Sequence, residues 1–139
     1  MDAFLGTWKL EKSELFDEYL AAKGVPWLIR KFILASSNTK IFEKIDENTY
    51  CVTEKQTKLT TVWKFELGQT FEAKGFDGKN HKITFTIEDG KLVETHIRFE
   101  DPKYKDQPEI FRYEIKGNEL IWHMYHDQIH AKRFFSKQN

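Results

Sequence analysis

The segment IHAKRFF, residues 129–135, places a permanent positive charge where an apolar side chain is expected. Side chains of a strand alternate between its two faces, so Arg133 shares a face with Ala131 and Phe135. Burying a guanidinium costs several kcal/mol unless a partner satisfies it. Three partners fit: an internal carboxylate such as Glu114, water at a strand end that reaches solvent, or the anionic group of a ligand.

A second arginine, Arg112, lies in the segment EIFRYEI between Phe111 and Tyr113. Those two aromatic residues and Ile115 share the strand face opposite to Arg112. Alternation alone therefore turns Arg112 outward, toward solvent.

Three further cations, Lys23, Arg30 and Lys31, fall in a stretch with helical periodicity. The simplest interpretation is a solvated helix face. The functional alternative is contact with a transport receptor or an anionic membrane, where each charge contributes about 1 kcal/mol. The sequence leaves both interpretations open.

Residue types that often bind metals or act in catalysis are present but poorly arranged for either role. His123, His126 and His130 have no Cys or acidic partner at a zinc-like spacing, which favours surface or turn positions. Cys51 has no identifiable base, which favours a buried apolar role. The chain also lacks a Gly-rich phosphate loop, a nucleophile elbow and an H-E-x-x-H motif. We therefore expect no catalytic residue, no metal and no cofactor.

Composition limits the class of protein. The chain has 139 residues, of which 40% are hydrophobic and 15% aromatic, and this predicts one packed domain over residues 1–139. Lys+Arg and Asp+Glu number 22 each, so the formal net charge is zero and general nucleic-acid binding is disfavoured. A single cysteine, no secretory leader pattern and no long apolar run favour a soluble protein of the reducing cytoplasm.

The elements that must position these residues follow from periodicity and turn signals. Residues 4–14 alternate as a strand, and residues 13–24 and 25–36 have helical spacing. From residue 38 onward, turn signals recur about every 8 to 12 residues, including FDGK at 76–79 and EDGK at 88–91. The pattern predicts an antiparallel meander of about ten strands, a sandwich or a barrel, with a helical pair after the first strand.

Several segments, in order, resemble the intracellular lipid-binding protein family, which includes cytosolic fatty-acid-binding and retinoid-binding proteins. The opening FLGTWKLEKSELFDEYLAAKGV resembles the family's first strand and helix, and TKIFEK resembles the strand after the second helix. FELGQTFE resembles a segment with a Leu-Gly-Gln turn, and AKRFFSK resembles the last strand. The resemblance implies an all-β fold: a ten-stranded antiparallel up-and-down β-barrel, capped by a helix-turn-helix lid, with a lipid inside.

The resemblance also implies a ligand site. The family's carboxylate site uses two lumenal arginines and a tyrosine. Arg112 and Arg133 fall on the arginines, although alternation turns Arg112 outward, and Phe135 stands where the tyrosine usually lies. The residues expected to cover the acyl chain are Phe16, Leu20, Leu28, Phe32, Trp122, Met124 and Phe135.

The expected function is that of a monomeric, non-enzymatic intracellular carrier of a long-chain fatty acid or a similar hydrophobic carboxylate. Some family members carry ligand to the nucleus through basic residues of the lid. Lys23, Arg30 and Lys31 are therefore a candidate nuclear-localisation patch, or a transient contact with a membrane or receptor. Two alternatives are a carrier of a retinoid or other hydrophobic ligand, and an interaction module whose own aromatic side chains fill the lumen.

Overall fold

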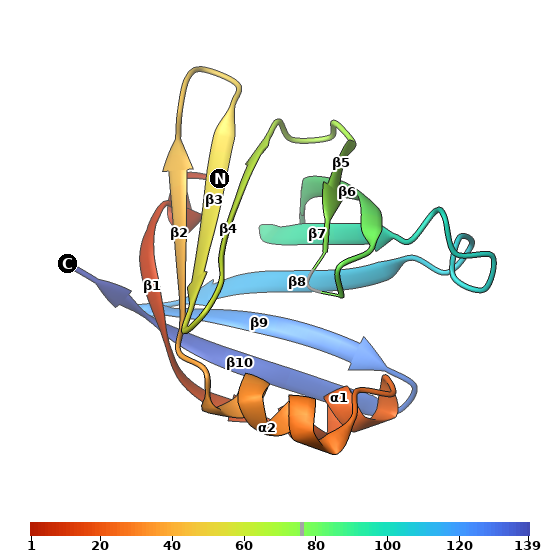
Figure 1. Cartoon of the computed structure of the whole chain (residues 1–139). Coiled ribbons are helices and arrows are strands. Elements are labelled where there is room, and N and C mark those ends of the chain that lie inside the picture. The colour runs from red at the N-terminus through yellow and green to blue at the C-terminus, as the bar shows by residue number, and fades with distance from the viewer. Residues whose placement is uncertain (76) are drawn as a thin grey trace.

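The structure, a computed structural model, describes residues 1–75 and 77–139. Over these residues the chain forms ten strands, two α-helices and one short 3-10 helix (Figure 1). In chain order they are η1 (Asp2–Phe4), β1 (Gly6–Glu14), α1 (Phe16–Ala22), α2 (Trp27–Ala35), β2 (Asn38–Lys44), β3 (Tyr50–Gln56), β4 (Thr60–Phe65), β5 (Phe71–Lys74), β6 (Asn80–Glu88), β7 (Lys91–Ile97), β8 (Glu109–Lys116), β9 (Glu119–His126) and β10 (Ile129–Gln138).

All ten strands join one antiparallel sheet in the order β4-β3-β2-β1-β10-β9-β8-β7-β6-β5. Figure 1 shows the sheet curling over, so that β2, β3 and β4 stand across the strands β7 to β10. β1 belongs to both parts because it pairs with β2 and β10, and its register shifts between Leu10 and Lys12. The predicted ten-stranded barrel is confirmed. It is not fully closed, because β4 and β5 lie at the two ends of the sheet and do not pair with each other.

Tight turns make the meander possible. Asp89 and Gly90 both have positive φ, 51° and 75°, as a two-residue hairpin between β6 and β7 requires. Other turns or bends of the meander lie at residues 46–48, 67–68 and 117–118. The turn expected at 76–79 begins at residue 76, which lies outside the described residues.

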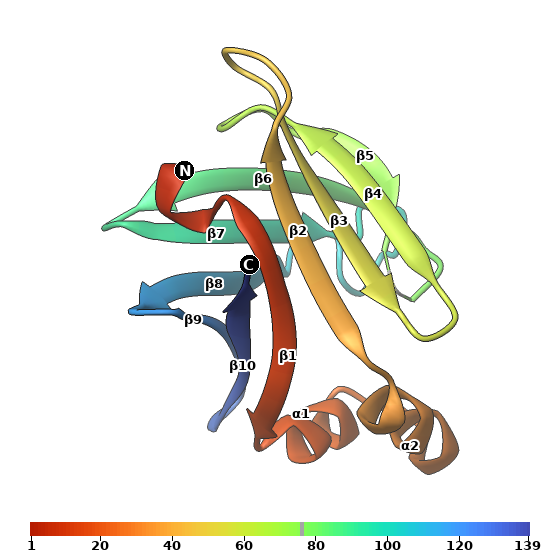
Figure 2. The ribbon, with the colours of Figure 1, turned by 90° about the vertical axis from the view of Figure 1, so that its left-hand side faces the viewer.

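The helical pair forms a lid at one end of the barrel, opposite the N-terminal turn (Figure 2). In α1, Phe16, Tyr19 and Leu20 share one face at helical spacing and are buried against the barrel. Gly24, with a φ of 87°, lies just beyond the end of α1. Neither helix of the described chain is long and apolar enough to cross a membrane.

Aromatic side chains fill much of the barrel interior. The rings of Phe65 and Phe85 stack with their centroids 4.2 Å apart, and Phe42 meets Tyr113 edge-on at 6.2 Å. Trp8 is buried and donates its indole N–H to the carbonyl oxygen of Phe4 at 2.9 Å. This core holds the strands on which the site residues lie.

Candidate functional site

Arg133 of β10 points into the barrel, as alternation predicted. Its side chain belongs to the face of Ala131 and Phe135, both fully buried, and Arg133 itself is 4% exposed. Across the ladder it pairs with Trp122 of β9, which lines the barrel cavity. The residue therefore places a guanidinium at the lumenal wall.

The guanidinium of Arg133 has few partners. Its Nε donates to the hydroxyl oxygen of Ser13 at 3.0 Å, and its central carbon lies 4.1 Å from the centre of the Phe16 ring. Among the described residues no carboxylate lies within 4.0 Å of it, so the suggested ion pair with Glu114 does not form. Burial lowers the pKa of Arg133 to about 10, a shift that the charge of Glu54 partly offsets.

A second cation inside the barrel is Lys40 of β2. Its ammonium group pairs with the carboxylate of Glu54 on β3, and Glu54 also accepts a hydrogen bond of 2.8 Å from the side chain of Gln56. The Lys40 nitrogen lies 4.4 Å from the centre of the Trp122 ring, so it reaches across the lumen to β9. The indole N–H of Trp122 is buried without an acceptor among the described residues. This region therefore offers donors to an incoming oxygen atom.

Deeper in the wall, five side chains form a hydrogen-bonded chain. Tyr113 Oη donates to Glu94 Oε1 at 2.8 Å, and Glu94 Oε2 bonds to Nε2 of His96. The Nδ1 atoms of His96 and His81 lie 2.8 Å apart, and Nε2 of His81 lies 2.9 Å from Oδ1 of Asp77. The chain runs from a partly exposed turn at Asp77 to the cavity wall at Glu94 and Tyr113.

Counting protons assigns a charge to this chain. Three hydrogen bonds join the two carboxylates and two imidazoles, but two neutral imidazoles supply only two N–H protons, so a third proton is present. Burial raises the pKa of Glu94, but His96, Lys40 and Tyr113 together hold it below its usual value. Burial also lowers the pKa of His81, although the charge of Asp77 acts in the opposite direction.

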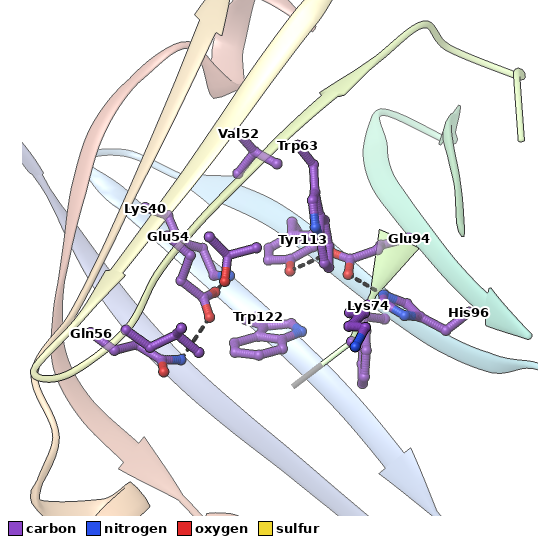
Figure 3. A pocket seen from close by; sticks show the side chains of 14 residues that line it. Lys40, Val52, Glu54, Gln56, Trp63, Lys74, Glu94, His96, Tyr113 and Trp122 are labelled. Carbon is purple, nitrogen blue, oxygen red and sulfur yellow. Dashed lines mark hydrogen bonds and ion pairs between the residues drawn. The ribbon is translucent and has the colours of Figure 1, made fainter. Parts of the chain in front are cut away.

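Several of these groups border one cavity inside the barrel (Figure 3), whereas Arg133, His81 and Asp77 are not among its lining residues. The volume of the cavity that water-sized molecules can occupy is about 70 Å³, which is room for roughly five waters. Figure 3 shows Lys40 and Glu54 on one side of the cavity and Glu94 and His96 on the other. The lining residues are Lys40, Val52, Glu54, Gln56, Leu59, Thr61, Trp63, Lys74, Gly75, Glu94, His96, Phe111, Tyr113 and Trp122.

Arg112 lies outside the lumen, so the position implied by the family resemblance is wrong and the alternation argument is right. Phe111 and Tyr113 line the cavity, and the pleat of β8 turns Arg112 to the opposite face. Tyr113 faces Trp122 across the ladder, whereas Arg112 faces His123. Of the two predicted arginines, Arg133 points into the barrel and Arg112 points outward, and contact of Arg133 with a ligand stays a prediction.

Two lid residues expected in the lumen, Leu28 and Phe32, are 60% and 64% exposed instead. Most apolar side chains of α2 point to solvent, while Ile33 packs against the buried core and the Arg30 side chain bonds to the fold. Arg30 donates to Asp17 of α1 and to the carbonyl oxygen of Val25, each at 2.8 Å. The prediction failed because periodicity identifies an apolar face without saying what it packs against.

The other residues expected along the acyl chain lie inside the fold. Trp122 borders the cavity, and the remaining four belong to the buried apolar cluster: Phe16, Leu20, Met124 and Phe135. Their contact with a ligand stays a prediction.

The predicted basic patch is not a free surface. Lys23 pairs with Glu109 of β8, and Arg30 pairs with Asp17, so both charges are already neutralised. Lys31 is exposed, with its nitrogen 5.4 Å from the centre of the Trp27 ring. One cation of the three is therefore available to a partner.

Of the three histidines of the β9–β10 hairpin, His123 is buried, which differs from the surface or turn position expected, and the ring of His126 at the end of β9 lies edge-on to that of Tyr19, with the centroids 6.5 Å apart. His123 bonds to His130 at 2.7 Å and to Glu114 at 2.6 Å, and His126 lies near Asp127. Among the described residues no cluster has the geometry of a metal site. Cys51 is buried, as expected.

The lumenal charges other than Arg133 were not among the predicted site residues. The same signal was available for them: Lys40 has the parity of Phe42 in NTKIFEK, and Glu94 has the parity of Leu92 in KLVETHI. Charged residues at strand positions that face the apolar side therefore mark this site on several strands.

Comparisons with known proteins agree with this architecture. The family model described as "Lipocalin / cytosolic fatty-acid binding protein family" matches residues 5–107. Fatty acid-binding protein homolog 3 of Caenorhabditis elegans is 40% identical over 140 residues, which cover 98% of this chain and 82% of that protein. The intestinal fatty acid-binding protein of Mus musculus is 32% identical, with 98% and 99% covered.

Solved structures show the same likeness. As-p18, described as an extracellular fatty acid binding protein, superimposes with a TM-score of 0.91 at 37% identity, covering 99% of this chain and 97% of its own. A Schistosoma mansoni fatty acid binding protein in complex with arachidonic acid superimposes with a TM-score of 0.85 at 26% identity, covering 100% and 98%.

Proposed function

Because the chain belongs to the lipocalin / cytosolic fatty-acid-binding protein family of non-enzymatic lipid carriers, we propose that it binds a long-chain fatty acid inside the barrel and carries it through water. The observation that carries this proposal is the buried guanidinium of Arg133, which has no carboxylate partner among the described residues. A ligand carboxylate supplies the missing anion. Charge-assisted and bidentate hydrogen bonds from the guanidinium then hold the head group.

The energetics suit a carrier. Each methylene of the acyl chain removed from water contributes about 0.8 kcal/mol, so ten methylenes supply roughly 8 kcal/mol before entropic costs. The free space of about 70 Å³ is too small for a long acyl chain. Binding therefore requires side chains at the lid end to move aside, among which Leu59 is exposed and borders the cavity.

The experiment is displacement of a fluorescent fatty-acid probe, after native mass spectrometry of the purified protein. We expect oleate to displace the probe with micromolar affinity or better, and methyl oleate, which lacks the charge, to compete less well. Retinoic acid in the same assay tests the retinoid alternative. Absence of any bound lipid and of any probe binding would favour the interaction module and refute the carrier.

Membrane contact during loading and unloading is part of the proposal. Trp27, Leu28 and Phe32 expose a continuous apolar face on α2, next to the free charge of Lys31. We expect transfer of a fluorescent fatty acid to anionic vesicles to slow when Trp27 and Phe32 are replaced by serine, with equilibrium affinity unchanged. Equal transfer rates would contradict this contact.

The compartment stays a prediction. A relative at 37% identity is described as extracellular, so membership in the family does not decide between cytoplasm, nucleus and the cell exterior. The intramolecular pairs of Lys23 and Arg30 disfavour nuclear delivery through the predicted patch. Imaging of the tagged full chain with and without oleate tests the location, and unchanged nuclear signal after Lys31→Gln would refute delivery through the lid.

A further inference from the structure

A second pocket lies on the outer wall of the barrel, away from the lumen. Its volume is about 310 Å³. It is bordered by the end of α1, the loop between β7 and β8, the first half of β8 and the end of β9. The lining residues are Lys23, Arg98, Tyr104, Gln107, Pro108, Glu109, Ile110, Arg112, Tyr125 and His126.

Two arginines, Arg98 and Arg112, provide positive charge and hydrogen-bond donors in this pocket. Arg112 belongs to none of the ion pairs among the described residues, although it is only partly exposed. The guanidinium of Arg98 stacks on Tyr104, with its central carbon 3.8 Å from the ring centre. Its Nη1 lies 3.9 Å from Asp77, whose carboxylate also faces His81 at 2.9 Å. The stacked Arg98 is therefore held in place with donors left for another acceptor.

Charge in the pocket is unbalanced. Lys23, Arg98 and Arg112 line it against a single carboxylate, Glu109, which pairs with Lys23. The lining residues thus carry an excess of two positive charges, and Asp77 beside the pocket offsets part of the charge of Arg98. A phosphate monoester carries about −1.5 to −2 charges at pH 7 and accepts bidentate hydrogen bonds from arginine.

We propose that this outer pocket binds a phosphate monoester group, with Arg98 and Arg112 as its anchors and Lys23 beside them. The site is separate from the lumen, because the pleat of β8 turns Arg112 away from the cavity that Phe111 and Tyr113 line. Two sources present the same chemistry: a small soluble phosphate ester, and the head group of a phospholipid such as phosphatidic acid.

The test uses the full chain and two probes. Glycerol 3-phosphate is titrated while amide ¹H–¹⁵N NMR shifts are recorded, and sedimentation is measured with phosphatidylcholine vesicles that contain phosphatidic acid or phosphatidylserine. The variants are Arg112→Met, which removes the guanidinium group, and Arg112→Lys, which keeps the positive charge but not the bidentate geometry. Lys64→Gln, an exposed lysine on β4 outside the pocket, is the matched control for loss of one charge.

We expect saturable shifts around the pocket with glycerol 3-phosphate, weakened about tenfold or more by Arg112→Met, less by Arg112→Lys and little by Lys64→Gln. Oleate binding should be the same in all four proteins, which also shows that the variants fold. Sedimentation that depends on Arg112 and prefers phosphatidic acid to phosphatidylserine would identify the lipid head group as the source. No saturable shift with either probe, or equal losses in Arg112→Met and Lys64→Gln, would overturn the proposal.

Discussion

Replacing Arg133 by methionine is expected to weaken fatty-acid binding and, in the same step, to stabilise the ligand-free protein. Methionine fills much of the same space without a charge. In the complex the variant loses a charge-assisted contact of roughly 1.5–3 kcal/mol. At about 1.4 kcal/mol per decade, the affinity for oleate should fall by about 10- to 100-fold.

The stability change has the opposite sign. Burial lowers the pKa of Arg133 to about 10, so folding has to desolvate a charged group, at a cost of roughly 3 kcal/mol. Methionine removes that cost but also loses the hydrogen bond to Ser13 and the contact with Phe16. We expect a net gain of about 1–2 kcal/mol in the free energy of unfolding of the ligand-free protein.

The assays are oleate displacement of a fluorescent probe and urea unfolding, each on wild type, Arg133→Met and Arg112→Met. Arg112→Met is the matched control, because it removes the same group from the outer face of β8 and should leave oleate binding unchanged. Methyl oleate should bind wild type and Arg133→Met alike. Unchanged oleate affinity in Arg133→Met would refute Arg133 as the anchor, and equal losses in both variants would refute the lumenal assignment.

Three other expectations concern the remaining lumenal charges. Glu54→Gln removes a carboxylate that pairs with Lys40, so oleate affinity should rise about fivefold, which corresponds to ~1 kcal/mol; a decrease in the displacement assay would contradict this. Burial lowers the pKa of His81 in the folded state. As the pH falls below about 6.5, the His81 imidazole is therefore protonated in the unfolded state before it is protonated in the folded state. Stability should therefore fall with pH from there by up to about 1.4 kcal/mol per unit, and urea unfolding of His81→Asn should show a smaller slope. In NMR spectra at neutral pH, the three hydrogen bonds from Asp77 to Glu94 should together hold three protons, and only two would contradict the proton count.

Local pattern was enough for the strands, the turns and the inward direction of Arg133. Alternation is a property of a single strand, so it can be read without knowing the neighbouring strands. The same rule placed Arg112 outside correctly, and only the family resemblance reversed it. Lys40 and Glu94 carried the same signal and were overlooked because their neighbours include more polar residues.

The orientation of α2 was beyond the reach of periodicity. The spacing of Leu28 and Phe32 predicts an apolar face, but the side of α2 that meets the fold carries Ile33 and the hydrogen bonds of Arg30 to Asp17 and Val25. Those partners lie 13 and 5 residues away in the chain, and the bend between the helices brings them together.

The sequence by itself thus determined an antiparallel barrel with a helical lid and one inward arginine, because alternation, turn residues and helix spacing act over a few neighbouring residues. Only the tertiary structure decided which buried charges meet. It paired Lys40 with Glu54, linked Asp77 to Glu94 through two histidines, and left Arg133 without a carboxylate among the described residues. The physical reason is that a buried charge is stabilised by whatever the closed sheet brings within hydrogen-bonding distance, and strand register sets those distances.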